Sequence, residues 1–189
     1  MVRWEPGARE RLQRAALDLF ASQGFEQTTA QQIAVAAGLT ERTFFRHFAD
    51  KREVLFDGQD QFVTAFLAGL DKVPPGAAPL ELVAAALRSA ADLFPDERRA
   101  YARLRQNVID QNPALLERER HKLAYVGTAV ADALRARGID DLRAALAAQS
   151  GTAVFGIAFA LWIRDGENRS LADLTSEVLG ELSSLASSR

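Results

Sequence analysis

The sequence of 189 residues predicts an all-α protein, and three observations support this fold class. Apolar residues recur every three or four positions in one segment after another, which is the period of an amphipathic helix. Glycine, proline and capping residues interrupt the chain where such helices would begin and end. No segment shows the strict alternation of apolar and polar residues that is typical of a half-buried strand.

The first predicted helix covers residues 9–22. Its apolar face consists of residues at helical spacing, namely Leu12, Ala15, Ala16, Leu19 and Phe20. Gly24 is expected to end the helix, and Phe25 to close a small core against the helices that follow. Residues 9–50 therefore predict a compact three-helix unit, whose thin core would depend on the next helix.

Residues 30–37 and 41–48 are predicted to form two short helices separated by a glycine turn. Thr29 and Thr40 stand where N-terminal caps are expected, and Gly38 stands where the chain would take a left-handed conformation. Two short helices joined by such a turn form a helix-turn-helix.

The second of these helices has two chemically different faces. At about 100° per residue, Phe44 and Phe48 lie on one side and Arg42 and Arg46 lie opposite. An outer face with guanidinium, hydroxyl and methyl groups is suited to reading base edges in a DNA major groove. The alternative interpretation is an ordinary surface helix whose arginines are solvated.

The stretch from Phe25 to Lys51 resembles the DNA-binding domain of the TetR family of transcriptional repressors. The matching residues are Thr28, Ile33, Ala34, Ala37, Gly38, Thr40, Thr43, His47, Phe48 and Lys51. The resemblance implies DNA contacts from Thr28, Thr29, Gln31, Thr40, Arg42, Thr43, Phe45, Arg46, His47 and Lys51. Phe45 replaces the family's usual Tyr, which removes a phenol hydrogen bond to phosphate. Arg42 replaces a frequent Gly and favours contact with guanine.

The remainder of the chain is also predicted to be helical. Asp50 is expected to cap a single helix over 51–70 that acts as a lever, and prolines break the chain at 73–79. Further helices are predicted over 80–94, 95–110 and 114–137, then through 144–163 after a cap at Asp140 or Asp141, and over 170–185. The predicted domains are a helix-turn-helix DNA-binding domain over 1–50 and a helical ligand-binding and dimerisation domain over 51–189.

Residues 144–163 carry no charge and have the length of a membrane span. The run is rich in small residues and poor in Leu and Ile, so we expect a helix buried in a soluble protein, with no membrane partner. The resemblance implies that the last two helices pair with those of a second subunit through Ala153, Gly156, Ala160, Leu174, Val178 and Leu182. Completion of the monomer core is the alternative role for these helices.

Aromatic and basic residues of the second domain are candidates for an effector site. The candidate ligand-binding residues are Arg98, Tyr101, Arg105, Tyr125, Phe155, Phe159 and Trp162. Aromatics at helical spacing also form ordinary cores, and dense arginines also form solvated faces. Residues 103–120 resemble actinobacterial TetR-type regulators associated with acyl-thioester-like ligands, which implies a hydrophobic or acyl-thioester-like effector.

Composition argues against several other classes of function. The chain has no cysteine and only two histidines, so it offers no thiolate or obvious metal site, and we expect no metal, no cofactor and no catalytic residues. The start of the chain has no apolar run, so we expect a cytoplasmic protein. The net charge of −2 provides no basic stripe, so any DNA contact needs local positive groups such as Arg3 and Arg9.

Together these observations predict a ligand-responsive regulator, most simply a repressor, which binds a palindromic DNA operator as a homodimer and is released by a small molecule. One alternative is a small-molecule binding protein or helical enzyme whose helix-turn-helix is only structural. Another is a DNA-binding protein that responds to no effector.

Overall fold

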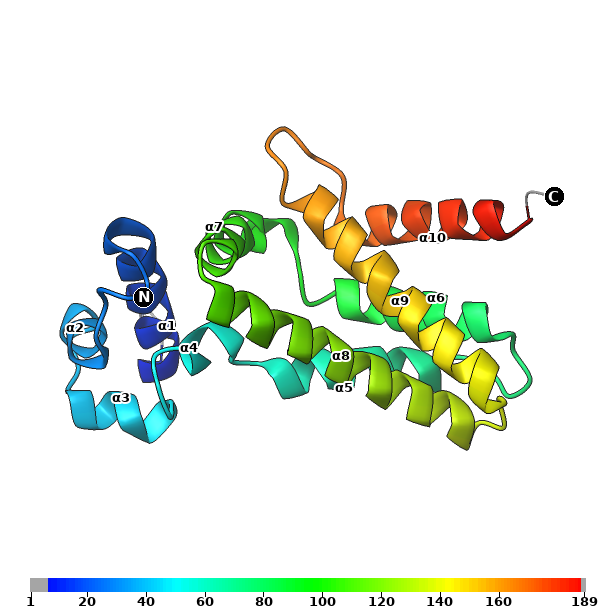
Figure 1. The fold of residues 1–189 in the computed structure, drawn as a ribbon, viewed down its shortest axis with the longest axis horizontal. Helices are drawn as coiled ribbons and strands as arrows, with labels where there is room; N and C mark the ends of the chain where they lie inside the picture. Colours follow the sequence, from blue (N-terminus) through cyan, green and yellow to red (C-terminus); the bar gives the residue numbers. More distant parts are fainter. Residues whose placement is uncertain (1–6, 188–189) are drawn as a thin grey trace, which may run out of the picture. The chain divides into compact units, whose positions relative to one another are not determined.

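The computed structural model describes residues 7–187, and all of the regular structure in this range is helical (Figure 1). The predicted all-α class is therefore confirmed. The elements are α1 (Ala8–Gln23), α2 (Ala30–Ala36), α3 (Glu41–His47), α4 (Glu53–Phe56), α5 (Gln59–Asp71), α6 (Pro79–Ala91), the 3-10 turn η1 (Asp96–Arg98), α7 (Arg99–Asp110), α8 (Pro113–Ala136), α9 (Asp141–Trp162) and α10 (Leu171–Ser187). Arg3 lies outside the described residues.

The chain divides into two compact units. The first unit contains the residues up to Asp57 together with Leu104–Glu119, and the second contains Gly58–Arg103 and the residues from Arg120 onward. Helix α7 therefore contributes its first residues to the second unit and the rest to the first unit.

The core of the first unit combines the three N-terminal helices with residues from three later helices, α4, α7 and α8. Leu12, Phe20, Ile33 and Phe44 are almost completely buried in it. Val108 and Ile109 of α7 and Leu115 of α8 complete the same cluster. A three-helix unit of this size has little apolar area of its own, so these later residues add needed burial.

The caps of α2 and α3 form as the sequence predicts. The Thr29 hydroxyl accepts the backbone N–H of Gln32 at 3.1 Å, and the Gln32 side chain accepts the N–H of Thr29 at 2.9 Å. The Thr40 hydroxyl accepts the N–H of Thr43 at 3.2 Å. Gly38 has a φ of +67° and makes the turn between the two helices.

The prediction of one continuous helix over 51–70 is wrong. Helix α4 ends at Phe56, Asp57 is extended, and Gly58 has a φ of +84° before α5 begins at Gln59. A left-handed residue ends the hydrogen-bonding pattern of a helix, and glycine adopts it without strain. Asp57 is held in place because its carboxylate accepts hydrogen bonds from Arg9 and, at 2.8 Å, from Gln13.

The core of the second unit is formed by α5, α6, α9 and α10 together with the part of α8 that carries Val126, Val130 and Leu134 (Figure 1). At its centre a cluster of aromatic rings makes mutual edge and stacking contacts: Phe62, Phe66, Phe94, Phe155, Phe159 and Trp162. Gly69 allows α5 to approach the backbone of α6 closely.

Helix α9 is the one described helix that is long and apolar enough to cross a membrane, with a mean hydropathy of 1.6. Core helices of soluble proteins share these properties. Eight residues of α9 are buried, among them Ala144, Phe155 and Trp162.

Candidate nucleic-acid interface

Helix α3 has the two-faced arrangement that the sequence predicts. Phe44 is fully buried and Phe48, directly after the helix, is nearly so, while Arg42 and Arg46 are exposed. Phe45 is 53% exposed, and its ring packs edge-on against Phe44 with 5.3 Å between centroids. The buried rings therefore hold a short helix whose outer face is open to a partner.

The two arginines of α3 are not engaged elsewhere. Among residues 7–187, neither Arg42 nor Arg46 forms a hydrogen bond or ion pair. Thr43 lies beside them, and its hydroxyl oxygen is 3.0 Å from that of Thr40. Free guanidiniums beside a hydroxyl are suited to both phosphate and base contacts.

Four more polar residues that were predicted to contact DNA lie in or next to α2 and α3. Thr29 and Gln31 are exposed, as is Thr40. His47 is partly buried, and its Nε2 atom has no hydrogen-bond partner among the described residues. The DNA contacts predicted for these four residues remain predictions.

Thr28 is a structural residue, and the prediction that it contacts DNA is wrong. It is only 1% exposed. Its hydroxyl donates to the Gly24 carbonyl at 2.8 Å and accepts from the Gln23 amide at 3.1 Å. The Thr28 hydroxyl therefore stabilises the turn after α1.

Lys51 also has a structural role, and the DNA contact predicted for it remains a prediction. Its ammonium donates to the carbonyls of Phe25 at 2.8 Å, Glu26 at 3.2 Å and Thr28 at 2.9 Å. The same ammonium lies 4.4 Å from the centre of the Phe25 ring. Lys51 thus closes the loop between α1 and α2 from the turn that precedes α4.

Sequence reasoning missed two residues that organise the first unit. Arg11 of α1 donates to the carbonyls of Ala37 and Gly38 in the turn before α3. The Asn112 amide donates to the Glu26 carboxylate at 3.0 Å and so joins the loop before α8 to the loop before α2. The partners are 26 to 86 residues apart, so no local motif identifies these contacts.

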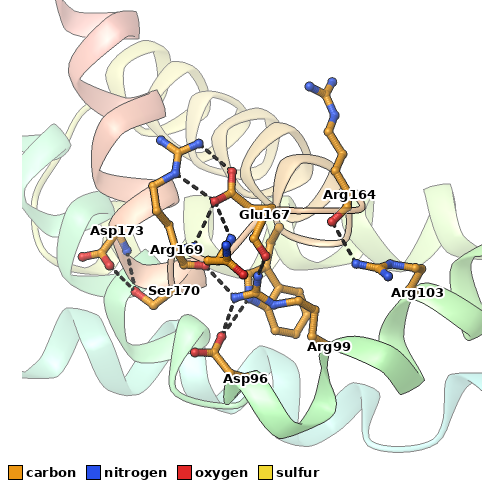
Figure 2. Close-up of polar contacts among 10 residues, drawn as sticks. Asp96, Arg99, Arg103, Arg164, Glu167, Arg169, Ser170 and Asp173 are labelled. Atoms are coloured by element: carbon orange, nitrogen blue, oxygen red, sulfur yellow. Dashed lines mark hydrogen bonds and ion pairs between the residues drawn. The ribbon is translucent and has the colours of Figure 1, made fainter.

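In the second unit, two arginines of α7 hold the loop between α9 and α10 (Figure 2). Arg99 donates to the carbonyls of Glu167 and Arg169, pairs with Asp96 at 2.5 Å and lies over the Trp162 ring. The guanidinium is therefore surrounded by the loop and the end of α9.

Arg103 holds the same loop closer to α9. It donates to the carbonyls of Ile163 at 2.5 Å and Arg164 at 2.8 Å, and it pairs with Asp165. Arginine satisfies the free carbonyls of a helix C-terminus well because its donors form a rigid fork. Arg99 and Arg103 of α7 thus both stabilise this loop.

Within this loop, Arg169 lowers the pKa of Glu167 to about 2 by hydrogen bonding to its carboxylate (Figure 2). Because the pKa of Glu167 is lowered, this ion pair stabilises the folded state at pH values above the ordinary pKa range of a glutamate. The contribution is lost as the pH falls from that range through about 2. The loop contacts of Glu167 are therefore present throughout the neutral range.

Of the residues predicted to bind a ligand, only the three aromatic residues of α9 are brought together. Arg105 lies in the first unit, where it donates to the Leu55 carbonyl at 2.7 Å and pairs with Glu119 at 2.8 Å, and its role in an effector site remains a prediction. Arg98, Tyr101 and Tyr125 are exposed. Phe155, Phe159 and Trp162 belong to the aromatic cluster of the core.

One cavity of the second unit lies between α6 and α10 and has a volume of about 310 Å³. It is lined by Ala84, Leu87, Arg88, Thr175, Ser176, Leu179, Gly180 and Ser183. None of these residues was predicted to bind a ligand, because small residues and serines on amphipathic helices carry no distinctive signal.

The predicted dimer residues fall into two groups. Ala153 and Ala160 of α9 are exposed and Gly156 is partly so, but Leu174 is fully buried in the monomer core, so its assignment to an interface is wrong. Val178 and Leu182 are half-buried and pack against the same core. Helix α9 also exposes three large apolar residues that were not predicted: Leu142, Leu146 and Ile157.

Two family models match the chain. Residues 12–57 match the model of bacterial regulatory proteins of the tetR family, and residues 77–187 match that of the MftR C-terminal domain. The second match alone covers more than half of the chain.

Two regulators are similar in sequence. The HTH-type transcriptional regulator TcmR of Streptomyces glaucescens is 47% identical over 81 residues, which are 43% of this chain and 36% of TcmR. MftR of Mycobacterium tuberculosis is 31% identical over 100 residues, which are 53% of this chain and 50% of MftR. The chain thus spans half or less of the length of these relatives.

Solved structures show the same fold over nearly the whole chain. The repressor FadR of Thermus thermophilus, in complex with lauroyl-CoA, is 26% identical with a TM-score of 0.53, and the match covers 96% of each chain. FadR from Bacillus halodurans is 15% identical with a TM-score of 0.62, covering 99% of this chain and 100% of that one. With the helix-turn-helix geometry and both family matches, these findings establish that the chain belongs to the TetR family of bacterial transcriptional regulators.

Proposed function

We propose that this protein is a ligand-responsive transcriptional repressor that binds a palindromic DNA operator as a homodimer. The observation that carries the proposal is the outer face of α3, where the side chains of Arg42 and Arg46 lie exposed beside Thr43 and have no partner within residues 7–187. The buried Phe44 fixes the opposite side of the helix. A short helix anchored in this way is suited to entering a major groove.

Arg42 is the residue best placed to read a base. It is the second residue of α3, and the N-terminal residues of a recognition helix are those that reach base edges. A guanidinium donates two parallel hydrogen bonds to guanine, so we expect a G·C pair in each half of the operator. Gln31 and Thr40 are exposed polar groups suited to phosphate contacts.

Helix α9 supports the proposed homodimer. Leu142, Leu146 and Ile157 are between 55% and 69% exposed, and their spacing places them on one side of the helix with Ala153. Large apolar residues aligned on one helix are costly to leave in water, and a second copy would cover them. This stripe replaces Leu174 in the interface that we propose.

The effector that we propose is apolar or acyl-thioester-like. The FadR relative bound to lauroyl-CoA supports this class. The aromatic cluster of the second unit offers apolar surface for an acyl chain, provided that some of its rings move apart. Such an effector would release DNA if it binds better to a conformation in which the two recognition helices are wrongly spaced. The activity that we propose is therefore regulation of transcription in the cytoplasm, and not catalysis.

Selection of DNA by the purified protein tests this function. Random duplexes would be bound at near-physiological salt, and the bound sequences read. We expect an enriched inverted repeat, and we expect Arg42→Ala to weaken binding by about 1–3 kcal/mol and to relax the preference at one position in each half-site. The absence of any enriched sequence would contradict the function, and an equal loss on all duplexes would contradict the base-reading role of Arg42.

The enriched duplex also tests the effector class. Lauroyl-CoA added to the complex should release the duplex, whereas free coenzyme A should leave it bound because it lacks the acyl chain. Release by both compounds, or by neither, would show that an acyl thioester is not the effector.

A further inference from the structure

We propose that Arg11 is the positioning residue of the recognition helix: it fixes the turn between α2 and α3 to α1 and thereby sets the direction in which α3 meets DNA. The inference rests on the proposed function for the role of α3. Arg11 acts through α3, since its own donors are used within the protein.

The turn contains carbonyls that the backbone leaves unsatisfied. The last four carbonyls of a helix have no partner within the helix. After α2, the N–H of Leu39 donates to the Ala34 carbonyl at 2.8 Å and the N–H of Gly38 to the Val35 carbonyl at 2.9 Å. No described backbone N–H outside the helices donates to the carbonyls of Ala37 or Gly38.

Arg11 satisfies both of these carbonyls. Its Nε donates to the Ala37 carbonyl at 3.0 Å, its Nη2 donates to the same oxygen, and Nη2 also lies 3.3 Å from the Gly38 carbonyl. The guanidinium is rigid and planar, so several donors on one turn fix its position better than a single donor would. Its charge also favours the C-terminal end of α2.

The contact is placed where it controls α3 most directly. Helix α3 begins at Glu41, and its cap Thr40 is only two residues after Gly38. Phe44 holds the middle of α3 and Phe48 holds its end, since both rings are buried, so the contacts of Arg11 fix the part that these rings leave, the start of the helix. Leu12, the neighbour of Arg11, is fully buried and anchors the other end of the contact.

Arg14 provides a matched control on the same helix. It is exposed and forms no hydrogen bond or ion pair with the described residues, so Arg14→Met removes the same charge without disturbing the turn. Both variants would be measured on the duplex enriched by the wild-type protein and on a scrambled duplex of equal length.

Arg11→Met should weaken binding to the enriched duplex by about 5- to 100-fold, the loss expected for one misaligned bidentate base contact, with little change on the scrambled duplex. Arg14→Met should affect both duplexes equally. Arg11→Lys, which keeps one donor, should fall between wild type and Arg11→Met. Equal behaviour of Arg11→Met and Arg14→Met would overturn the proposal.

Amide hydrogen exchange separates this inference from the proposed function. In Arg11→Met the amides of Gly38 and Leu39 should exchange faster, whereas the amide of Phe20 in the core of α1 should keep its rate. Unchanged exchange at Gly38 and Leu39 would overturn the role of Arg11. If the wild-type protein enriched no duplex, the proposed function would fail, and faster exchange would still show that Arg11 holds the turn.

Discussion

At the scale of single residues, partly buried cations organise the first unit together with its apolar side chains. Lys51 and Arg11 each reach across more than twenty residues to backbone carbonyls, most of which accept from no backbone N–H of the described turns and loops. A carbonyl removed from water without a donor costs free energy. These side chains therefore stabilise the loops that carry the recognition helix.

We expect Lys51→Met to lower the free energy of unfolding by about 2 kcal/mol, because hydrogen bonds from a charged donor contribute more than neutral ones. Urea denaturation of the two proteins measures this difference. Lys72→Met is the control, since Lys72 is exposed and has no side-chain partner among the described residues. If both variants had the same stability as the wild type, the three carbonyl contacts of Lys51 would be energetically unimportant.

Residue roles were predictable where they depend on near neighbours. Thr29 and Thr40 cap their helices through partners three residues away, and the exposed positions of Arg42 and Arg46 follow from helix geometry. Thr28 was misassigned because a family motif does not distinguish a buried threonine from an exposed one. The partners of Lys51 lie on a loop that only the tertiary fold brings near.

At the scale of elements, the break at Asp57 and Gly58 is the main difference between sequence and structure. Leu55 and Phe62 are seven residues apart and would share one face of a helix, so the prediction of one helix bridges residues 57–61, which contain no apolar side chain. Gly58 and the contacts of Asp57 with α1 decide otherwise. The spacing of apolar residues predicts well that a helix exists. Whether one residue within it adopts a left-handed conformation depends on tertiary contacts.

The packing of α5 on α6 depends on Gly69. A Cβ atom at this position would lie 2.4 Å from the Ala85 carbonyl oxygen and 2.5 Å from the Ala86 Cα, and both are backbone atoms that cannot move aside easily. We expect Gly69→Ala to destabilise the protein by about 1–3 kcal/mol through overpacking, despite the better helix propensity of alanine.

Gly180 of α10 is the matched control for this prediction. A Cβ atom there would meet no heavy atom within 4 Å, so Gly180→Ala should stabilise the helix by up to about 1 kcal/mol. Thermal unfolding of both variants gives the comparison. Equal stability of the two would show that α5 and α6 separate without cost.

At the scale of the whole molecule, the chain combines two compact units whose limits do not follow the order of the sequence. Leu104–Glu119 belongs with the N-terminal helices, a pairing that no local pattern indicates. The division into a DNA-binding domain over 1–50 and a ligand-binding and dimerisation domain over 51–189 therefore remains a proposal about function. The aromatic residues of the second unit show the same difficulty, since helical spacing does not reveal whether rings fill a core or line a pocket.

The proposed dimer depends on the exposed stripe of α9. Leu146 is 60% exposed in the single chain, so Leu146→Glu should leave the monomer folded while placing a charge in the interface. Leu80→Glu is the control, because Leu80 is an exposed leucine on α6. We expect the first variant to become monomeric and to bind the enriched duplex at least about tenfold more weakly, since two linked recognition helices bind together.

The molar mass of the complex with the enriched duplex, measured by light scattering at near-physiological salt, tests the central claim most directly. The account predicts two chains on each inverted repeat for the wild type and for Leu80→Glu, and loss of this complex for Leu146→Glu. One wild-type chain bound per duplex, or an intact two-chain complex of Leu146→Glu, would contradict a dimer formed through α9 that presents two recognition helices to DNA.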